Sequence, residues 1–72
     1  MPRGPELPYV RVEAALRERI AQGEWSVDAA LPSVAALAES YGVSRATVAR
    51  ALRQLESDGL VRIVPRWGTF KT

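Results

Sequence analysis

Hydrophobic residues recur along this chain at two different spacings. Between Ser44 and Gly59 they follow one another at intervals of three or four, as on one face of a helix, and they are Val48, Ala51, Leu52 and Leu55. The Ser44 hydroxyl can cap the start of a helix, and Gly59 can take the left-handed conformation that closes one. The pattern therefore predicts an amphipathic helix over residues 44–58.

The side of this helix that is turned away from the apolar stripe is small, polar and basic. It carries Ala46, Arg50, Arg53 and Ser57, with Thr47 beside them and Arg45 at its N-terminal end. A helix with such a face can enter the major groove of DNA. The alternative is that these arginines only keep a helix surface in solution.

Two further helices are predicted before this one. Tyr9, Val12, Leu16 and Ile20 recur at helical spacing, which indicates a helix from Pro8 or Tyr9 to Gln22 that ends at Gly23. A shorter helix is expected over Val34–Ser40, with Ser33 as its N-cap, and Gly42 fits the turn that follows. Two helices joined by a tight turn of this kind form a helix-turn-helix. Between the first two helices, Leu31 is a candidate for a short strand pairing, and Tyr9 and Trp25 are expected to pack at the core or its rim.

After Gly59 the spacing becomes that of a strand. Leu60–Val64 is rich in β-branched residues, Pro65–Gly68 has the composition of a turn, and Thr69–Thr72 can form a second strand. Because a two-stranded hairpin is not stable alone, it should pack on the helices through Phe70 and one side of the first strand. We therefore expect a mainly α fold with a small β-hairpin, a winged helix-turn-helix over residues 9–72, preceded by a flexible lead-in over residues 1–8.

Composition limits the chemistry available to this protein. The chain has 72 residues, enough for one domain, and contains neither cysteine nor histidine. Without these residues, and without a glycine-rich phosphate loop, we expect neither an enzyme nor a metal or cofactor site. No apolar run approaches membrane-spanning length and no signal peptide is evident, so a cytoplasmic location is expected.

The charge of the chain is unevenly distributed. Residues 1–44 carry four cations and six anions, whereas residues 45–72 carry six cations and two anions. The basic half thus contains the amphipathic helix and the hairpin, and a polyanion would bind there.

The ordered set of motifs resembles the N-terminal DNA-binding domain of GntR-family bacterial transcription regulators. The resemblance extends over nearly all of the chain from Tyr9. It is carried by Tyr9, Leu16, Ile20, Gly23, Leu31-Pro32-Ser33, Leu37-Ala38, Gly42-Val43-Ser44-Arg45, Thr47-Val48, Ala51-Leu52, Leu55, Gly59-Leu60 and Gly68-Thr69-Phe70. It implies a cytosolic regulator, often a repressor, that binds operator DNA as a dimer on a near-palindrome. Its third helix would enter the major groove and its wing would reach the minor groove.

The sequence departs from this family in several places. Val34-Ala35-Ala36 replaces a frequent Glu-Arg-Glu, so that Ala35 cannot make the contact that the arginine commonly makes. Ala49 stands where an arginine is often found, and Arg66 replaces a glycine at the tip of the wing. The large effector-binding and dimerisation domain of the family has no counterpart here. The chain is then either an excised reader domain or a small standalone regulator, and no effector is expected to bind this segment.

The candidate DNA-binding residues follow from the helix, the wing and the resemblance. They are Ser33, Ser44, Arg45, Ala46, Thr47, Arg50, Arg53, Arg66, Trp67 and Gly68. Arg45 is the first candidate for base recognition, although it could contact phosphate instead. Ser33 and Ser44 could bind phosphate or only cap their helices. Trp67 could pack against Leu60–Val64, which aromatic side chains favour, or lie on the sugar edge of the DNA. A winged helix used as a protein-interaction module remains the alternative function.

Overall fold

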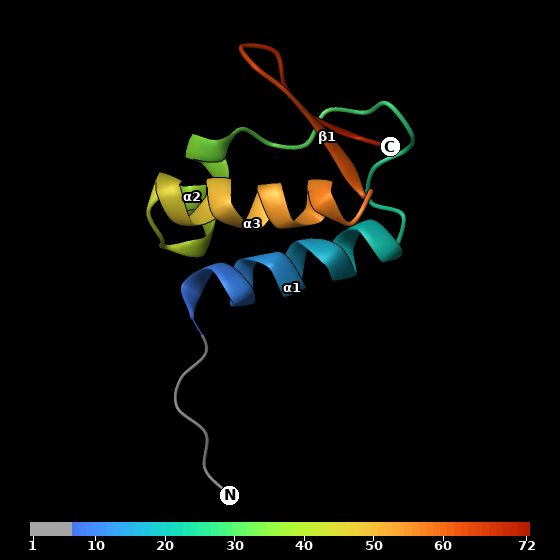
Figure 1. Ribbon diagram of the computed structural model, residues 1–72. Helices are drawn as coiled ribbons and strands as arrows, with labels where there is room; N and C mark the ends of the chain where they lie inside the picture. Colours follow the sequence, from blue (N-terminus) through green and yellow to red (C-terminus); the bar gives the residue numbers. More distant parts are fainter. Residues whose placement is uncertain (1–6) are drawn as a thin grey trace, which may run out of the picture.

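The chain folds into three helices followed by a two-stranded antiparallel hairpin. The computed structural model describes residues 7–72 (Figure 1). The elements are α1 (Pro8–Ala21), α2 (Val34–Tyr41), α3 (Arg45–Ser57), β1 (Val61–Val64) and β2 (Gly68–Lys71). The predicted winged helix-turn-helix is thus confirmed. The lead-in expected over residues 1–8 lies, apart from Leu7 and Pro8, outside the described residues.

The helix ends follow local capping chemistry. The Ser33 side chain accepts a hydrogen bond from the Ala36 backbone N–H at 3.0 Å, and the Ser44 side chain accepts one from Thr47 at 3.1 Å. Gly42 follows α2 in the left-handed conformation, with φ of 66°. Both serines are therefore N-caps as predicted, and α2 continues one residue further than expected, to Tyr41.

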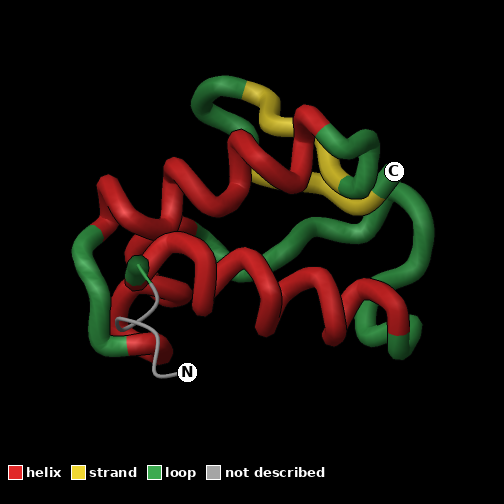
Figure 2. Tube along the Cα trace, turned by 60° about the horizontal axis from the view of Figure 1, so that its bottom comes forward, coloured by secondary structure: helices red, strands yellow, loops and turns green. Residues whose placement is uncertain are grey.

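One apolar core joins the three helices and the hairpin. The stripe predicted on α3 is buried completely, and no residue of it is more than 1% exposed. Figure 1 shows α3 between α1 on one side and the hairpin on the other, and Figure 2 shows the same elements turned by 60°. The buried apolar side chains are Val12, Leu16, Ile20, Leu31, Leu37, Ala38, Val48, Ala51, Leu52, Leu55 and Val61. Trp25 packs on the rim of this core, as expected.

The hairpin is attached to the body of the protein by a third segment. The Leu31 N–H donates to the Thr69 carbonyl, the Asp28 N–H donates to the Lys71 carbonyl, and the Lys71 N–H donates to the Ala29 carbonyl. This confirms a strand-like pairing at Leu31, although the bridge itself is formed by Ala30 and Phe70. The base of the wing is therefore held by hydrogen bonds on both sides of β2.

The side of the second strand that faces the core differs from the prediction. The register pairs Ile63 with Thr69 and Arg62 with Phe70, so that Thr69 lies on the side of the buried Val61. Thr69 is 6% exposed, whereas Phe70 is only half-buried. The turn occupies only Pro65–Trp67, and β2 begins at Gly68 instead of Thr69. Successive side chains in a strand point to opposite faces, so the register decides which of these two residues is buried.

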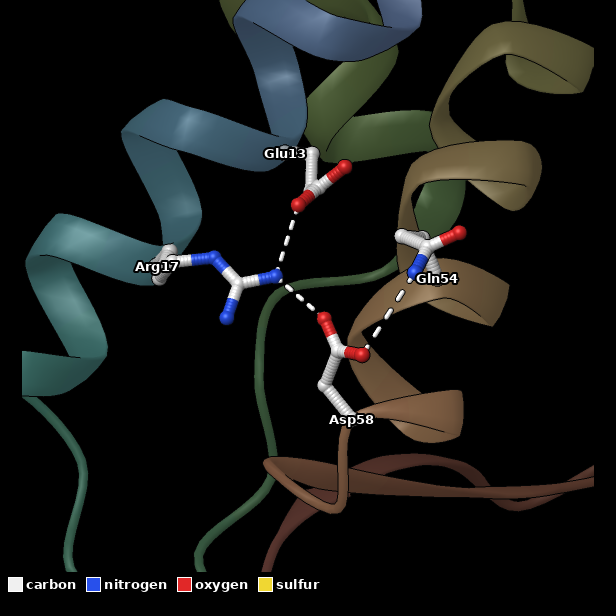
Figure 3. A network of polar contacts seen from close by, with 4 residues as sticks. All are labelled: Glu13, Arg17, Gln54 and Asp58. Carbon is white, nitrogen blue, oxygen red and sulfur yellow. Dashed lines mark hydrogen bonds and ion pairs between the residues drawn. The ribbon is translucent and has the colours of Figure 1, made fainter.

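An ion-pair network joins the C-terminal halves of α1 and α3. Arg17 on α1 contacts Glu13 one turn earlier at 2.6 Å and reaches across to Asp58, which follows α3 (Figure 3). Gln54 donates to the other oxygen of Asp58. Arg17 holds the pKa of Asp58 below its usual value by hydrogen bonding to the carboxylate. Within residues 7–72, no helix has the length and apolar character needed to cross a membrane.

Candidate nucleic-acid interface

The outer face of α3 is arranged as its sequence predicts. Ala46, Arg50, Arg53 and Ser57 are all exposed, and Thr47 is half-buried at the edge of this face. Arg45 is the first residue of α3 and is also exposed. The small side chain of Ala46 lets another molecule approach the helix backbone closely between the longer arginines.

The start of α3 presents two hydroxyl groups next to Arg45. The hydroxyl oxygens of Ser44 and Thr47 lie 2.9 Å apart and share a hydrogen bond, in addition to the capping bond that Ser44 accepts from the Thr47 N–H. Capping thus accounts for Ser44 by itself. It also fixes both hydroxyls at the exposed N-terminal end of the helix, where the partial positive charge of the helix dipole favours an anion.

Arg50 has a partner that the sequence did not reveal. Its guanidinium lies over the ring of Tyr9 on α1, 3.9 Å from the ring centroid. Tyr9 is half-buried, and Arg50 remains exposed. A shallow recess of about 260 Å³ at this junction is lined by Leu7, Pro8, Tyr9, Ala46, Thr47 and Arg50. No sequence signal could connect these residues, since Tyr9 and Arg50 lie on different helices.

The tip of the wing carries two exposed side chains in a tight turn. The Trp67 N–H donates to the Val64 carbonyl, and Arg66 between them has φ of 71°, a left-handed conformation that favours glycine. Trp67 is 80% exposed, so the prediction that it packs against Leu60–Val64 is wrong. The turn holds the indole beyond the last strand pair, Val64 with Gly68, where it is not buried by the body of the protein.

A groove separates the wing from the start of α2. It measures about 470 Å³, and its walls include Ser33, Val34, Ile63, Arg66, Trp67 and Gly68. The structure therefore brings four predicted site residues together here, namely Ser33, Arg66, Trp67 and Gly68. Three others, Ala46, Thr47 and Arg50, share the recess beside Tyr9, whereas Ser44, Arg45 and Arg53 line neither hollow.

Several acidic side chains are engaged in contacts away from the outer face of α3. Asp58 and Glu13 bind Arg17, and Glu24 binds Arg19, whose guanidinium holds the pKa of Glu24 below its usual value. The Glu56 carboxylate accepts a hydrogen bond from the Ile63 backbone N–H at 2.7 Å and is thereby directed to the wing strand. Among residues 7–72, the cations of α3 and the wing tip form no ion pair. Their charge is therefore available to a polyanion.

Potential metal ligands are not clustered in the part of the chain that the structure describes. Over residues 7–72, no three histidine, cysteine, aspartate or glutamate side chains are grouped so that they could hold a metal ion. The chemistry of this surface is that of guanidinium, hydroxyl, indole and backbone N–H groups, which suits binding to phosphates and base edges.

A protein-family model matches most of the chain. Residues 8–70 match the model described as bacterial regulatory proteins, gntR family. The chain belongs to this family. The expected resemblance to GntR regulators is thereby confirmed, and the names found for this family and its members are those of regulators rather than enzymes.

Curated GntR relatives include repressors from several bacteria. The chain is 40% identical over 70 residues to the histidine utilization repressor of Klebsiella aerogenes, covering 96% of this chain and 29% of the relative. It is also 40% identical over 62 residues to the mannosyl-D-glycerate transport/metabolism system repressor MngR of Escherichia coli K12, covering 86% of this chain and 26% of the relative. The chain thus spans under a third of the length of these curated relatives.

Solved structures share the whole fold of this GntR domain. The AraR DNA-binding domain in complex with operator ORX1 superimposes with a TM-score of 0.90 at 31% identity, covering 100% of this chain and 93% of that chain. The N-terminal domain of AraR in complex with mutant ORR3 gives a TM-score of 0.92 at 31% identity, with 97% and 100% coverage. The winged helix described above is therefore the fold of domains crystallised on operators.

Proposed function

We propose that this GntR domain binds double-stranded operator DNA in a sequence-specific manner, as the reader domain of a transcriptional repressor. The observation that carries the proposal is the exposed surface of α3, where arginines that form no ion pair within residues 7–72 flank the small Ala46. The fold shared with operator-bound AraR domains supports it, as does the kinship with repressors. A role as a protein-interaction module is not favoured, because this surface carries arginines and small side chains rather than large apolar ones.

In this arrangement α3 enters the major groove, and its arginines contact both base edges and the DNA backbone. The groove is about 12 Å wide and admits a helix. Arg45 and Arg50 reach base edges, where a guanidinium can donate two hydrogen bonds to the O6 and N7 atoms of guanine. Arg53, one turn beyond Arg50, contacts the backbone. Ala46 permits close approach.

The wing and the helix N-termini hold the sugar-phosphate backbone and the minor groove. Ser44 and Thr47 donate hydroxyl hydrogen bonds to phosphate, and Ser33 does so from the start of α2. Arg66 extends toward the minor groove, whose narrow A·T-rich tracts attract arginine. Trp67 and Gly68 contact the sugar edge, because the indole is 80% exposed at the tip and lines the same groove as Ser33.

The proposal extends to the assembly and location of the regulator. A near-palindromic operator would bind two copies of the chain, one at each half-site, and two-fold symmetric sites of this kind are typical of helix-turn-helix proteins. The regulator acts in the cytoplasm, and the effector binds outside this segment. With Ala35 and Ala49 in place of cations, a single copy binds weakly.

The decisive experiment is selection of bound duplexes from a random pool, followed by titration of the enriched duplex. A single enriched motif is expected, and its symmetry reports whether two copies bind together. Affinity should fall steeply with salt, by a slope of about 0.9 in log units for each phosphate that is neutralised. If the chain binds no duplex even at about 50 mM salt, where non-specific binding is strong, the proposed function is wrong.

A further inference from the structure

Among the arginines proposed to contact DNA, Arg50 is the one held by an aromatic ring of another helix. Its guanidinium carbon lies 3.9 Å from the centroid of the Tyr9 ring, a distance typical of a close cation–π contact. The second contact of this type within residues 7–72 joins Arg19 to Trp25. Arg19 is also bound to Glu24 and Tyr41, so its role is internal. Arg50 has no such additional partners there and projects from the outer face of α3.

The Tyr9 ring is carried by the first turn of α1 at its junction with α3. Tyr9 is the second residue of α1, directly after Pro8, which occupies the first turn of the helix and fixes one backbone dihedral. The ring is half-buried at the junction of α1 with α3, where Leu7, Pro8 and Thr47 line the same recess. Farther along the two helices, Arg17 and Asp58 bridge α1 to the end of α3 (Figure 3). The position of the ring relative to α3 is thus determined by helix packing.

Stacking leaves the recognition chemistry of a guanidinium intact. At 3.9 Å from the ring centroid the guanidinium is close enough to stack face to face, a geometry in which its five N–H donors lie in the plane of the group and point outward. A free arginine side chain samples many rotamers, and it loses that freedom when it binds. An arginine already stacked on a fixed ring has lost part of this freedom before DNA arrives.

We propose that Tyr9 is a positioning residue for DNA recognition, which stacks on Arg50 and aims its N–H donors at one base pair of each half-site. This inference rests on the proposed DNA binding. Tyr9 acts through its ring face and needs no hydroxyl contact of its own. Base discrimination at the position read by Arg50 then depends on a residue of α1, a helix that does not enter the groove.

The test is a double-mutant cycle on the duplex selected by the wild-type chain. Y9L, R50A and Y9L/R50A are titrated together with Y9F, which keeps the aromatic face. Y9L should weaken binding by about two- to fivefold, because part of the cost of ordering the Arg50 side chain would then fall on the binding step. Y9L should cause no further loss once Arg50 is alanine, and Y9F should bind like the wild type. Affinities are also measured for duplexes that differ at one base pair. Y9L should reduce the difference in affinity between bases only at the position where R50A also reduces it.

A matched control uses Arg53, which lies on the same face and has no aromatic partner within residues 7–72. In an R53A background Y9L should retain its full effect. If Y9L weakens binding equally in the R50A and R53A backgrounds, Tyr9 acts only through the fold and the inference is overturned. Tighter binding by Y9L would also overturn it, because the ring would then hold Arg50 away from DNA. So would an equal loss in Y9F, which would assign the effect to the hydroxyl.

A measurement on the free protein separates this inference from the proposed function. In the wild type, the ring current of Tyr9 should shift the NMR signals of the Arg50 side chain upfield, and Y9L should remove that shift. Absence of the shift refutes the stacking even if DNA binds. Presence of the shift together with no binding to any duplex refutes the proposed function, and with it the role of Tyr9 in recognition.

Discussion

Replacing Arg66 by glycine should stabilise the domain and at the same time weaken its binding to DNA. Arg66 adopts φ of 71° at the wing tip, in the region that costs an ordinary residue about 1–2 kcal/mol. Glycine has no such cost, but it adds freedom to the unfolded chain, which offsets about 0.5–1 kcal/mol. The net gain in the free energy of unfolding is then about 0.5–1 kcal/mol. In a domain of this size that gain raises Tm by roughly 2–8 °C.

The DNA-binding effect of the same substitution has the opposite sign. R66G removes the cation at the tip, so affinity falls and the slope of log affinity against log salt decreases by about 1 if Arg66 neutralises a phosphate. R66A separates the two effects, because it removes the charge but keeps a side chain in the left-handed conformation. The two variants should bind DNA equally weakly, and only R66G should be more stable than the wild type.

Asp28 supplies a control for this comparison. It is the other non-glycine residue with positive φ among residues 7–72, at 70°, and it lies at the base of the wing, hydrogen-bonded to Lys71. D28G should leave DNA affinity unchanged, with a smaller gain in stability because aspartate tolerates this conformation better than arginine. Thermal and urea unfolding followed by circular dichroism measure the stabilities. If R66G proves no more stable than R66A, the argument from backbone conformation is refuted.

Four further substitutions test separate parts of the structure. L52A should destabilise the fold by about 2–5 kcal/mol in urea unfolding, because Leu52 is 1% exposed in the middle of the core, and a loss below about 1 kcal/mol would contradict this packing. R45A should relax discrimination at one or two base pairs of each half-site by about 1–3 kcal/mol, and an unchanged profile over single-base duplex variants would rule out base recognition by Arg45. W67A should change stability by no more than about 0.5 kcal/mol because the indole is exposed, yet lower DNA affinity, and unaltered affinity would remove Trp67 from the interface. Arg17 lowers the pKa of Asp58 in the folded state, so the ion pair stabilises the fold above the ordinary aspartate pKa of about 4, and this stabilisation is lost as the pH falls through the lowered pKa. D58N should therefore flatten the decline in the free energy of unfolding below about pH 4. An acid-unfolding curve identical to that of the wild type would refute this linkage.

The elements whose signals are local were predictable from the sequence. The buried stripe of α3, the caps at Ser33 and Ser44 and the turn at Gly42 each depend on residues within a few positions of one another. Periodicity and capping act over this range, so the pattern alone is sufficient. The same periodicity predicted the outer face of α3, which contains many of the candidate site residues.

The errors concern features that depend on distant contacts or on one residue of register. Expecting a four-residue turn at Pro65–Gly68 placed Phe70 on the core side, whereas pairing of Val64 with Gly68 places Thr69 there. Trp67 was expected to be buried because aromatic side chains usually are, but a three-residue turn lifts it away from the strands. The stacking of Arg50 on Tyr9 depends on how α1 crosses α3, which sequence spacing does not encode.

The attachment of the wing at its base has a consequence for how the protein can evolve. Hydrogen bonds to Ala29 and Leu31 hold β2 near Lys71 and Thr69, whereas the tip at Pro65–Trp67 is exposed and contributes no buried residue to the core. Substitutions at the tip therefore escape most of the selection for folding that acts on α3, where nearly every third or fourth residue is buried. Under the proposed function, preferences at the edges of the operator should diverge earlier among descendants of this gene than preferences at the bases assigned to α3.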